Sequence, residues 1–147
     1  MKWDRDPQSL NYDPLLLNCF EGLMETEHPY KFTSRQIIKN LLDVNIVRSA
    51  YEKTKPLLPK IVLSLRNSLA STNDFNDDLL ILQQLSELVK EELNIYLHLI
   101  LQPINKVTMQ KKHKIKINET LRLLEHNGGE EALKVIKKKI PTYIGMF

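Results

Sequence analysis

The sequence contains little of what membrane proteins and secreted scaffolds require. It has one cysteine, which excludes an internal disulfide and suits a reducing compartment. No apolar run reaches the roughly 18 residues of a transmembrane helix, and the stretch at 93–101 is interrupted by Asn94 and His98. The first ten residues lack the apolar core of a secretion signal, and Asp4 and Asp6 speak against a transit peptide. We therefore expect a cytoplasmic protein that does not span a membrane.

Catalytic signatures are missing as well. The chain has no GxGxxG, P-loop, HExxH, GxSxG or CxxC motif. Cys19 stands beside Phe20, which indicates core packing rather than a nucleophile. Glu21 and Glu25 lie one helical turn apart, as on a solvated helix face. The histidines fall on separate predicted elements: His28, His98, His113 and His126. We therefore expect no catalytic residue, no metal site, no cofactor and no enzymatic activity.

Nearly every segment instead has the apolar spacing of a helix. The 147 residues, of which 42% are hydrophobic and 27% charged, fit one helical domain at 12–147 after a polar segment at 1–11. Asp13-Pro14 predicts the start of the first helix. Pro29 separates it from the second, and Pro56 begins the third after a short helix or loop at 44–53. The residues predicted to face inward are Leu16, Phe20, Leu23, Met24, Ile37, Ile38, Leu41, Leu42, Leu58, Ile61, Val62, Leu65 and Leu69.

A fourth helix is predicted after a cap at Asp74 or Asn76. Its expected inner face consists of Leu79, Leu82, Leu85, Leu88 and Val89. The fifth helix, at about 93–109, is apolar on most sides and is therefore expected in the middle of the fold, with a kink at Pro103.

The C-terminal part predicts a basic connector at 110–116, with a weak strand-like alternation at 114–117. A sixth helix should begin near Asn118 and stop at Gly128-Gly129. The last helix, at 130–139, has glutamates at its start and lysines at its end, as the helix dipole favours.

About seven helices joined by short turns leave two architectures, a compact bundle or an α-solenoid of stacked hairpins. Hairpins begin near residues 13, 56 and 93, a spacing of roughly forty residues that is typical of HEAT or armadillo repeats. The all-α solenoid is therefore the favoured fold.

Charge is distributed unevenly along the chain, whose net charge is +3. Residues 110–147 contain nine Lys and Arg against four Asp and Glu, a net of +5, whereas residues 67–105 contain one against six, a net of −5. Lysines at a helix end suit a solvated surface without a partner. If they do bind a partner, the lack of arginine forks and interleaved aromatics favours an acidic protein over a nucleic acid. The candidate partner contact is the set Lys111, Lys112, Lys114, Lys116, Lys137, Lys138 and Lys139.

Three blocks of sequence resemble the parkin co-regulated gene protein family, and look closest to its "like" branch. They are SLNYDPLLLNCFEGLMETEHPYKF at 9–32, KPLLPKIVLSLRNSL at 55–69 and LRLLEHNGGEEALKVIKKKIPTY at 121–143. The resemblance implies a HEAT/armadillo-like α-solenoid without enzymatic activity that associates with tubulin and axonemal proteins, in the cytoskeleton or a ciliary axoneme. The residues that match the family pattern all indicate fold-determining positions: Gly22, His28, Pro29, Tyr30, Gly128, Gly129 and Pro141.

Three functions remain open on the sequence. The first is a microtubule-associated adaptor, which the resemblance favours. The second is a general scaffold that holds a peptide or helix of another protein in its groove without binding tubulin. The third, a nucleic-acid binder, rests only on the lysines and a pI near 8.9.

Overall fold

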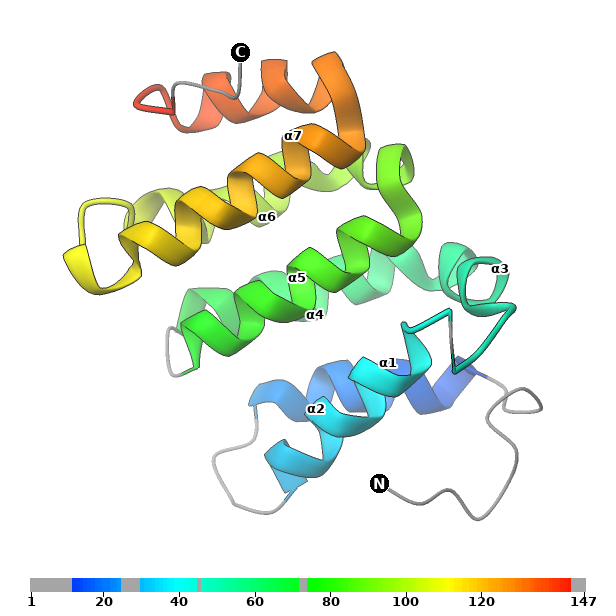
Figure 1. The fold of residues 1–147 in the computed structure, drawn as a ribbon. Coiled ribbons are helices and arrows are strands. Elements are labelled where there is room, and N and C mark those ends of the chain that lie inside the picture. Colours follow the sequence, from blue (N-terminus) through cyan, green and yellow to red (C-terminus); the bar gives the residue numbers. More distant parts are fainter. Residues whose placement is uncertain (1–11, 25–29, 45, 72–73, 144–147) are drawn as a thin grey trace.

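A computed structural model describes residues 12–24, 30–44, 46–71 and 74–143, and its fold is built from helices (Figure 1). No strand occurs within these ranges, so the all-α class is confirmed. The predicted polar segment at 1–11 and the His28-Pro29 break lie outside the described residues.

The first half of the chain follows the predicted pattern closely. Its elements are α1 (Tyr12–Glu21), η2 (Gly22–Met24), α2 (Tyr30–Leu41), α3 (Ala50–Thr54), η3 (Lys55–Leu57) and α4 (Leu58–Ser71). Asp13 has non-helical backbone angles inside the bounds of α1, which agrees with its predicted place at the helix start. All five residues predicted to face inward on α4 are buried. The apolar stripes therefore identified these helices correctly.

The second half contains α5 (Phe75–Val89), η4 (Lys90–Tyr96), α6 (Leu97–Lys106) and α7 (Lys111–Lys139). The predicted fifth helix at 93–109 is thus divided between the 3-10 helix η4 and α6, and Pro103 lies inside α6. Ile95 on η4 is 70% exposed. The expectation that the apolar residues of this segment are all buried is therefore wrong at this position. Asp74 occupies the N-cap position of α5 without a side-chain cap bond, and its carboxylate instead pairs with Arg35 of α2 at 3.0 Å.

The prediction of a basic connector at 110–116 is wrong, because these residues form the first turns of α7. The predicted helix start near Asn118 is wrong for the same reason, and the alternation at 114–117, which is too short to predict a strand, lies within this helix. His113 and Ile117 are buried one turn apart, with Thr120 and Leu121 continuing the same face. The His113 ring packs on Phe75, with 4.8 Å between the centroids. The lysines lie on the other faces of a continuous helix.

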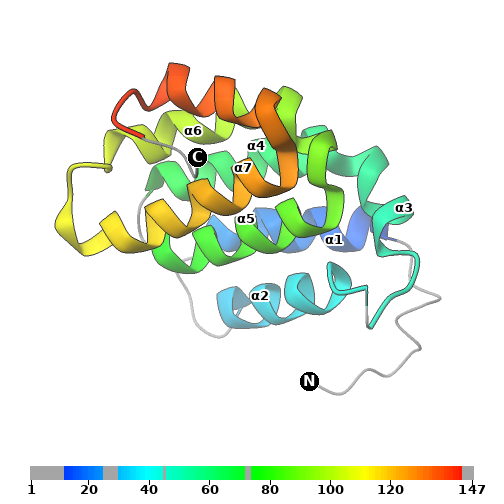
Figure 2. The same ribbon diagram turned by 45° about the horizontal axis from the view of Figure 1, so that its top comes forward.

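The helices are arranged in two layers. Helix α4 packs against both α1 and α6, which places these three side by side, while α5 contacts α2 and α7 in the other layer. Antiparallel pairs α1/α2, α4/α5 and α6/α7 follow one another through the stack (Figures 1 and 2). The core runs without interruption between the layers, from Phe20 through Leu65 and Leu85 to Ile136.

Helix α7 turns a sharp corner at Gly129, where φ is 75° and ψ is −156°. The helical backbone is therefore interrupted at the predicted place, Gly128-Gly129, and continues in a new direction. An added Cβ at Gly128 would meet the Asn94 side chain and lie 2.6 Å from Cβ of Ala132. The Asn94 amide donates to the Gly128 carbonyl at 2.9 Å. Glycine is needed at 128 for space and at 129 for its backbone conformation.

We call the end of the stack that holds α3, η4 and this corner the fastened end, because polar side chains tie its elements together (Figure 1). Glu92 of η4 accepts a hydrogen bond from the Tyr51 hydroxyl at 3.1 Å and pairs with Lys55 at 3.4 Å. The Asn127 amide donates to the Ser86 hydroxyl at 3.0 Å. These contacts join α3, η4, α5 and α7.

Candidate protein-interaction groove

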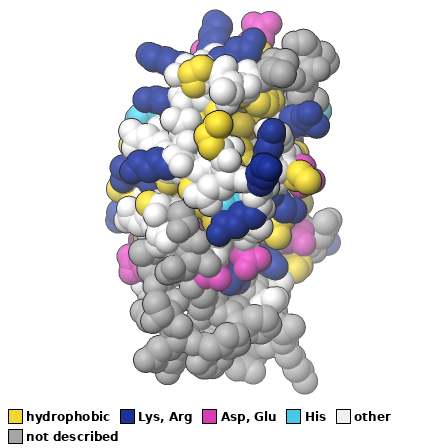
Figure 3. Space-filling view, turned by 90° about the vertical axis from the view of Figure 1, so that its left-hand side faces the viewer, with side chains coloured by type: hydrophobic (Ala, Val, Ile, Leu, Met, Phe, Trp, Pro, Cys, Tyr) yellow, Lys and Arg dark blue, Asp and Glu magenta, His cyan; other side chains and the backbone are white. Residues whose placement is uncertain are grey.

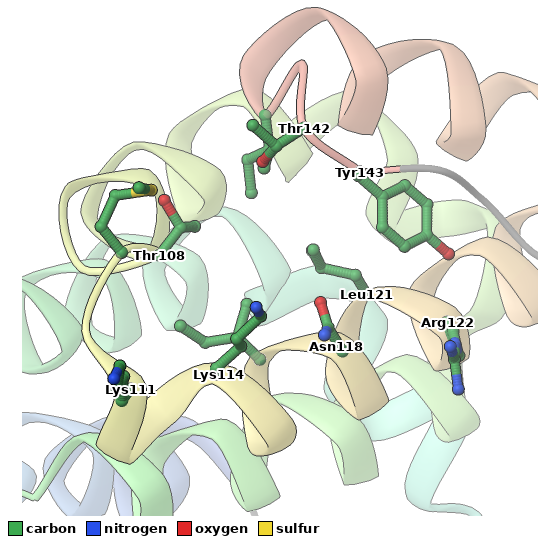
Figure 4. Close-up of a pocket in the computed structure, with 11 residues that line it drawn as sticks. Thr108, Lys111, Lys114, Asn118, Leu121, Arg122, Thr142 and Tyr143 are labelled. Carbon is green, nitrogen blue, oxygen red and sulfur yellow. The ribbon is translucent and has the colours of Figure 1, made fainter.

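A groove of about 590 Å³ opens at the opposite end of the stack, between α7 and the residues that follow it (Figure 4). We call it the basic groove. Its lining consists of Thr108, Met109, Lys111, Lys114, Ile117, Asn118, Leu121, Arg122, Ile140, Thr142 and Tyr143.

One wall of the basic groove is a single face of α7. Lys111, Lys114, Asn118 and Arg122 recur at intervals of three or four residues, which brings them onto one side of the helix. Figure 4 shows them along α7, with Thr142 and Tyr143 across from them. The continuity of α7 through Lys111 is therefore what assembles this wall.

The other wall is held by the turn after α7. Ile140 is buried, and its N–H donates to the Ile136 carbonyl at 2.7 Å. The Tyr143 hydroxyl donates to the Glu125 carboxylate at 2.8 Å in a buried contact. Burial and the Glu125 carboxylate raise the pKa of Tyr143 above its usual range. The phenol thus stays protonated and keeps residues 140–143 attached to α7.

The charged side chains that line the basic groove are all cationic. No Asp or Glu belongs to its lining, and within the described ranges Lys111, Lys114 and Arg122 form no ion pair. Figure 3 looks onto this end and shows Lys and Arg side chains around a group of apolar ones. Met109 of the groove lining and Ile115 on the first turns of α7 are exposed, with fractions of 86% and 76%. A cationic rim with an apolar interior suits an acidic, partly apolar partner.

The predicted lysines are divided among different places. Lys111 and Lys114 line the basic groove, while Lys116 pairs with Glu119 at 3.4 Å. Lys112, Lys137 and Lys138 are exposed outside the groove lining. Lys139 lines a second groove of about 480 Å³ together with Arg66, Lys106, Gln102, Asn105, Ala70, Leu101 and Pro103.

Sequence reasoning missed Arg122, Arg66 and Lys106 as members of these two grooves. Arg122 follows Lys111 and Lys114 at helical spacing, a signal that becomes visible only when 110–116 is interpreted as helix. Arg66 and Lys106 come from α4 and α6. Their approach to Lys139 depends on the packing of three helices and has no counterpart in the local sequence.

The other residues considered for chemistry lie apart from the basic groove. Cys19 is buried in the core, and burial raises its pKa to about 11. His98 and His126 are exposed, whereas His113 is buried between α7 and α5, and burial lowers its pKa with a smaller contribution from Lys112. Glu21 is exposed, and Glu25 lies outside the described residues.

Two kinds of feature are absent from the described part of the chain. No three His, Cys, Asp or Glu side chains there lie together in a way that could hold a metal ion. In the same residues, no helix combines the length and the apolar character needed to cross a membrane.

The model of the parkin co-regulated protein family matches residues 1–145. The chain belongs to this family. A curated relative, the parkin coregulated gene protein homolog of Mus musculus, is 31% identical over 161 residues. That alignment covers 96% of this chain and 65% of the mouse protein, so the chain spans about two thirds of the length of the relative. The family resemblance of the sequence is thereby confirmed.

Proposed function

We propose that this member of the parkin co-regulated family is a non-catalytic adaptor that associates with tubulin or microtubules, in the cytoskeleton or a ciliary axoneme. The observation that carries the proposal is the basic groove, where Lys111, Lys114 and Arg122 have no ion-pair partner among the described residues and lie beside the exposed Met109. The stacking of successive helical pairs in two layers supports a HEAT/armadillo-like α-solenoid as the platform (Figure 2).

An acidic protein surface, such as the outer face of tubulin, complements this end of the molecule. Exposed lysines attract such a surface over roughly a Debye length, about 8 Å at physiological ionic strength. Lys111, Lys112 and Lys114 are exposed on the first turns of α7 and supply the contact. Lys137 and Lys138 extend the cationic character to the end of the same helix.

Co-sedimentation with microtubules at increasing ionic strength tests the proposal. We expect the wild type to pellet at low salt and to be released as salt rises, because exposed charges carry the contact. A variant with Lys111→Glu, Lys112→Glu and Lys114→Glu should pellet less at every salt concentration. The control is Lys39→Glu with Lys60→Glu, which reverses two exposed lysines of α2 and α4, and it is compared with the double variant Lys111→Glu with Lys114→Glu, which has the same change of net charge.

Two results would contradict the proposal in different ways. Equal pelleting of the wild type and the triple variant at every salt concentration would exclude these lysines as the contact. A wild type that stays in the supernatant at low salt would exclude microtubule association itself.

A general scaffold without tubulin binding is the second candidate function. The exposed Met109 and Ile115 favour it, because apolar side chains beside a groove are typical of a protein-binding surface. Proximity labelling in ciliated cells separates the two functions. Axonemal neighbours support the adaptor, and a diffuse cytosolic set supports the scaffold.

A further inference from the structure

We infer that the basic groove binds an extended acidic peptide that carries apolar side chains between its carboxylates. This inference deepens the proposed function and rests on it, since it names the chemistry of the partner segment at the same surface. The spacing of the cations, the volume of the groove and its apolar surface point to this ligand.

The cations fix the length of the ligand. Lys111 and Arg122 are eleven residues apart on α7, which corresponds to about 16 Å along a helix. An extended peptide rises about 3.3 Å per residue, so about five residues span that distance. A ligand with carboxylates at both ends of such a segment meets Lys111 and Lys114 at one end and Arg122 at the other.

The volume of the groove favours an extended ligand over a helical one. A helix with its side chains is about 10–12 Å wide, so a 16 Å length of it occupies roughly 1,300–1,800 Å³. The basic groove offers about 590 Å³. A single extended strand of chain fits this space, and its backbone needs polar partners along its length. Asn118 and Thr142 lie on opposite walls and are placed to bond to that backbone (Figure 4).

The apolar surface at the groove selects for apolar side chains in the ligand. Ile117, Leu121 and Ile140 form a floor that is almost fully buried, whereas Met109 is 86% exposed and supplies most of the apolar surface open to a ligand. Burial of an aliphatic or aromatic ligand side chain against Met109 is favourable by about 25 cal/mol per Å² of apolar surface. A purely anionic chain, whether polyglutamate or a nucleic acid, would leave Met109 uncovered.

Fluorescence anisotropy with three labelled heptapeptides tests the inference in the absence of tubulin. The probes are Glu-Glu-Leu-Phe-Leu-Glu-Glu, a heptamer of glutamate, and Lys-Lys-Leu-Phe-Leu-Lys-Lys. We expect the first to bind at least tenfold more tightly than either of the others at physiological salt. A labelled oligothymidylate of seven nucleotides is included as the nucleic-acid probe and should bind at least tenfold more weakly than the first peptide.

A charge-reversed variant locates the binding. Lys114→Glu with Arg122→Glu should weaken binding of the first peptide at least tenfold. The control is Lys39→Glu with Lys60→Glu, which makes the same change of net charge away from the groove and should alter the affinity less than twofold. Circular dichroism of both variants verifies that the helices are retained.

The inference is overturned if the glutamate heptamer or the oligothymidylate binds as tightly as the mixed peptide. It is also overturned if the groove variant binds like the wild type, or if no peptide binds. Peptide binding without microtubule pelleting leaves the inference standing and removes tubulin from the proposed function. Microtubule pelleting without peptide binding overturns the inference and leaves the proposed function standing.

Discussion

The two ends of the helical stack use their polar side chains differently. At the fastened end, Glu92 is shared by Tyr51 and Lys55, and Asn94 binds the Gly128 carbonyl. At the end with the basic groove, Lys111, Lys114 and Arg122 share one side of α7 with no acid in the groove lining. The polar side chains named at the fastened end are paired with one another within the protein. The cations that line the basic groove face solvent with like charges.

This difference separates the residues that maintain the fold from those available to a partner. Polar groups that packing shields from water need partners within the protein, and the half-buried Asn94 and Asn127 find theirs at the corner of α7. Exposed cations are screened by water and salt and cost the fold little. Mutations at the fastened end should therefore change stability, while mutations in the basic groove should change binding.

The largest effect on stability is expected for Gly129→Ala at the fastened end. Its backbone angles belong to a region that only glycine adopts readily, and an added Cβ would meet nothing within 4 Å. The cost is therefore backbone strain alone, about 1–3 kcal/mol of unfolding free energy. Urea denaturation followed by circular dichroism measures it. Lys114→Ala in the basic groove is the control and should change stability by less than about 0.5 kcal/mol; equal losses in the two variants would erase the contrast between the ends.

A somewhat smaller loss is expected for Gly128→Ala. The new methyl group would crowd Ala132 and the Asn94 side chain, which costs about 1–3 kcal/mol and is offset by about 1 kcal/mol of helix propensity. We expect a net loss of about 0–2 kcal/mol in the same denaturation experiment.

Adding Asn94→Ala sharpens this second prediction. Truncation of Asn94 removes one of the two obstacles, so Gly128→Ala should cost less in the Asn94→Ala background than in the wild type. If the two losses simply add, then Asn94 does not determine the need for glycine at this position.

The smallest effect is expected at the other end, from His113 as pH falls. The folded protein holds the pKa of His113 below its usual 6.5 through burial and Lys112, while its Nδ1 lies 3.0 Å from the Asn76 side-chain oxygen. The unfolded chain therefore takes up this proton first, so stability should decline as pH drops below about 6.5.

Urea denaturation at pH 7.5 and pH 5.5 measures this decline. His113→Asn removes the titrating group and should reduce the difference between the two pH values. An unchanged difference would show that the pH dependence arises from other groups.

The sequence predicted the helices whose apolar residues form one clear stripe. In α4, Ile61, Val62 and Leu65 recur at helical spacing, and all are buried. The start of α7 was not predicted because its buried face contains His113 and Thr120, which a hydrophobicity pattern counts as polar. Only the packing of His113 on Phe75 makes that face visible.

The candidate contact was predictable in composition but not in arrangement. The lysine-rich segment identified Lys111 and Lys114 correctly as exposed cations near one another. It did not reveal that Arg122 belongs with them, or that Lys139 lies beside Arg66 of a distant helix. Side chains from separate elements meet through tertiary packing, about which local sequence carries little information.

The hydrogen bond from Tyr143 to Glu125 has a mechanical consequence. It joins two residues that are 18 positions apart in the chain. This hydrogen bond and the buried side chain of Ile140 attach the short turn at 140–143 to the rest of the protein. Both attachment points are buried, so the turn is held against the same helix that carries the cations. The width of the aperture is therefore set by contacts of the core, and the opening exists before any ligand arrives.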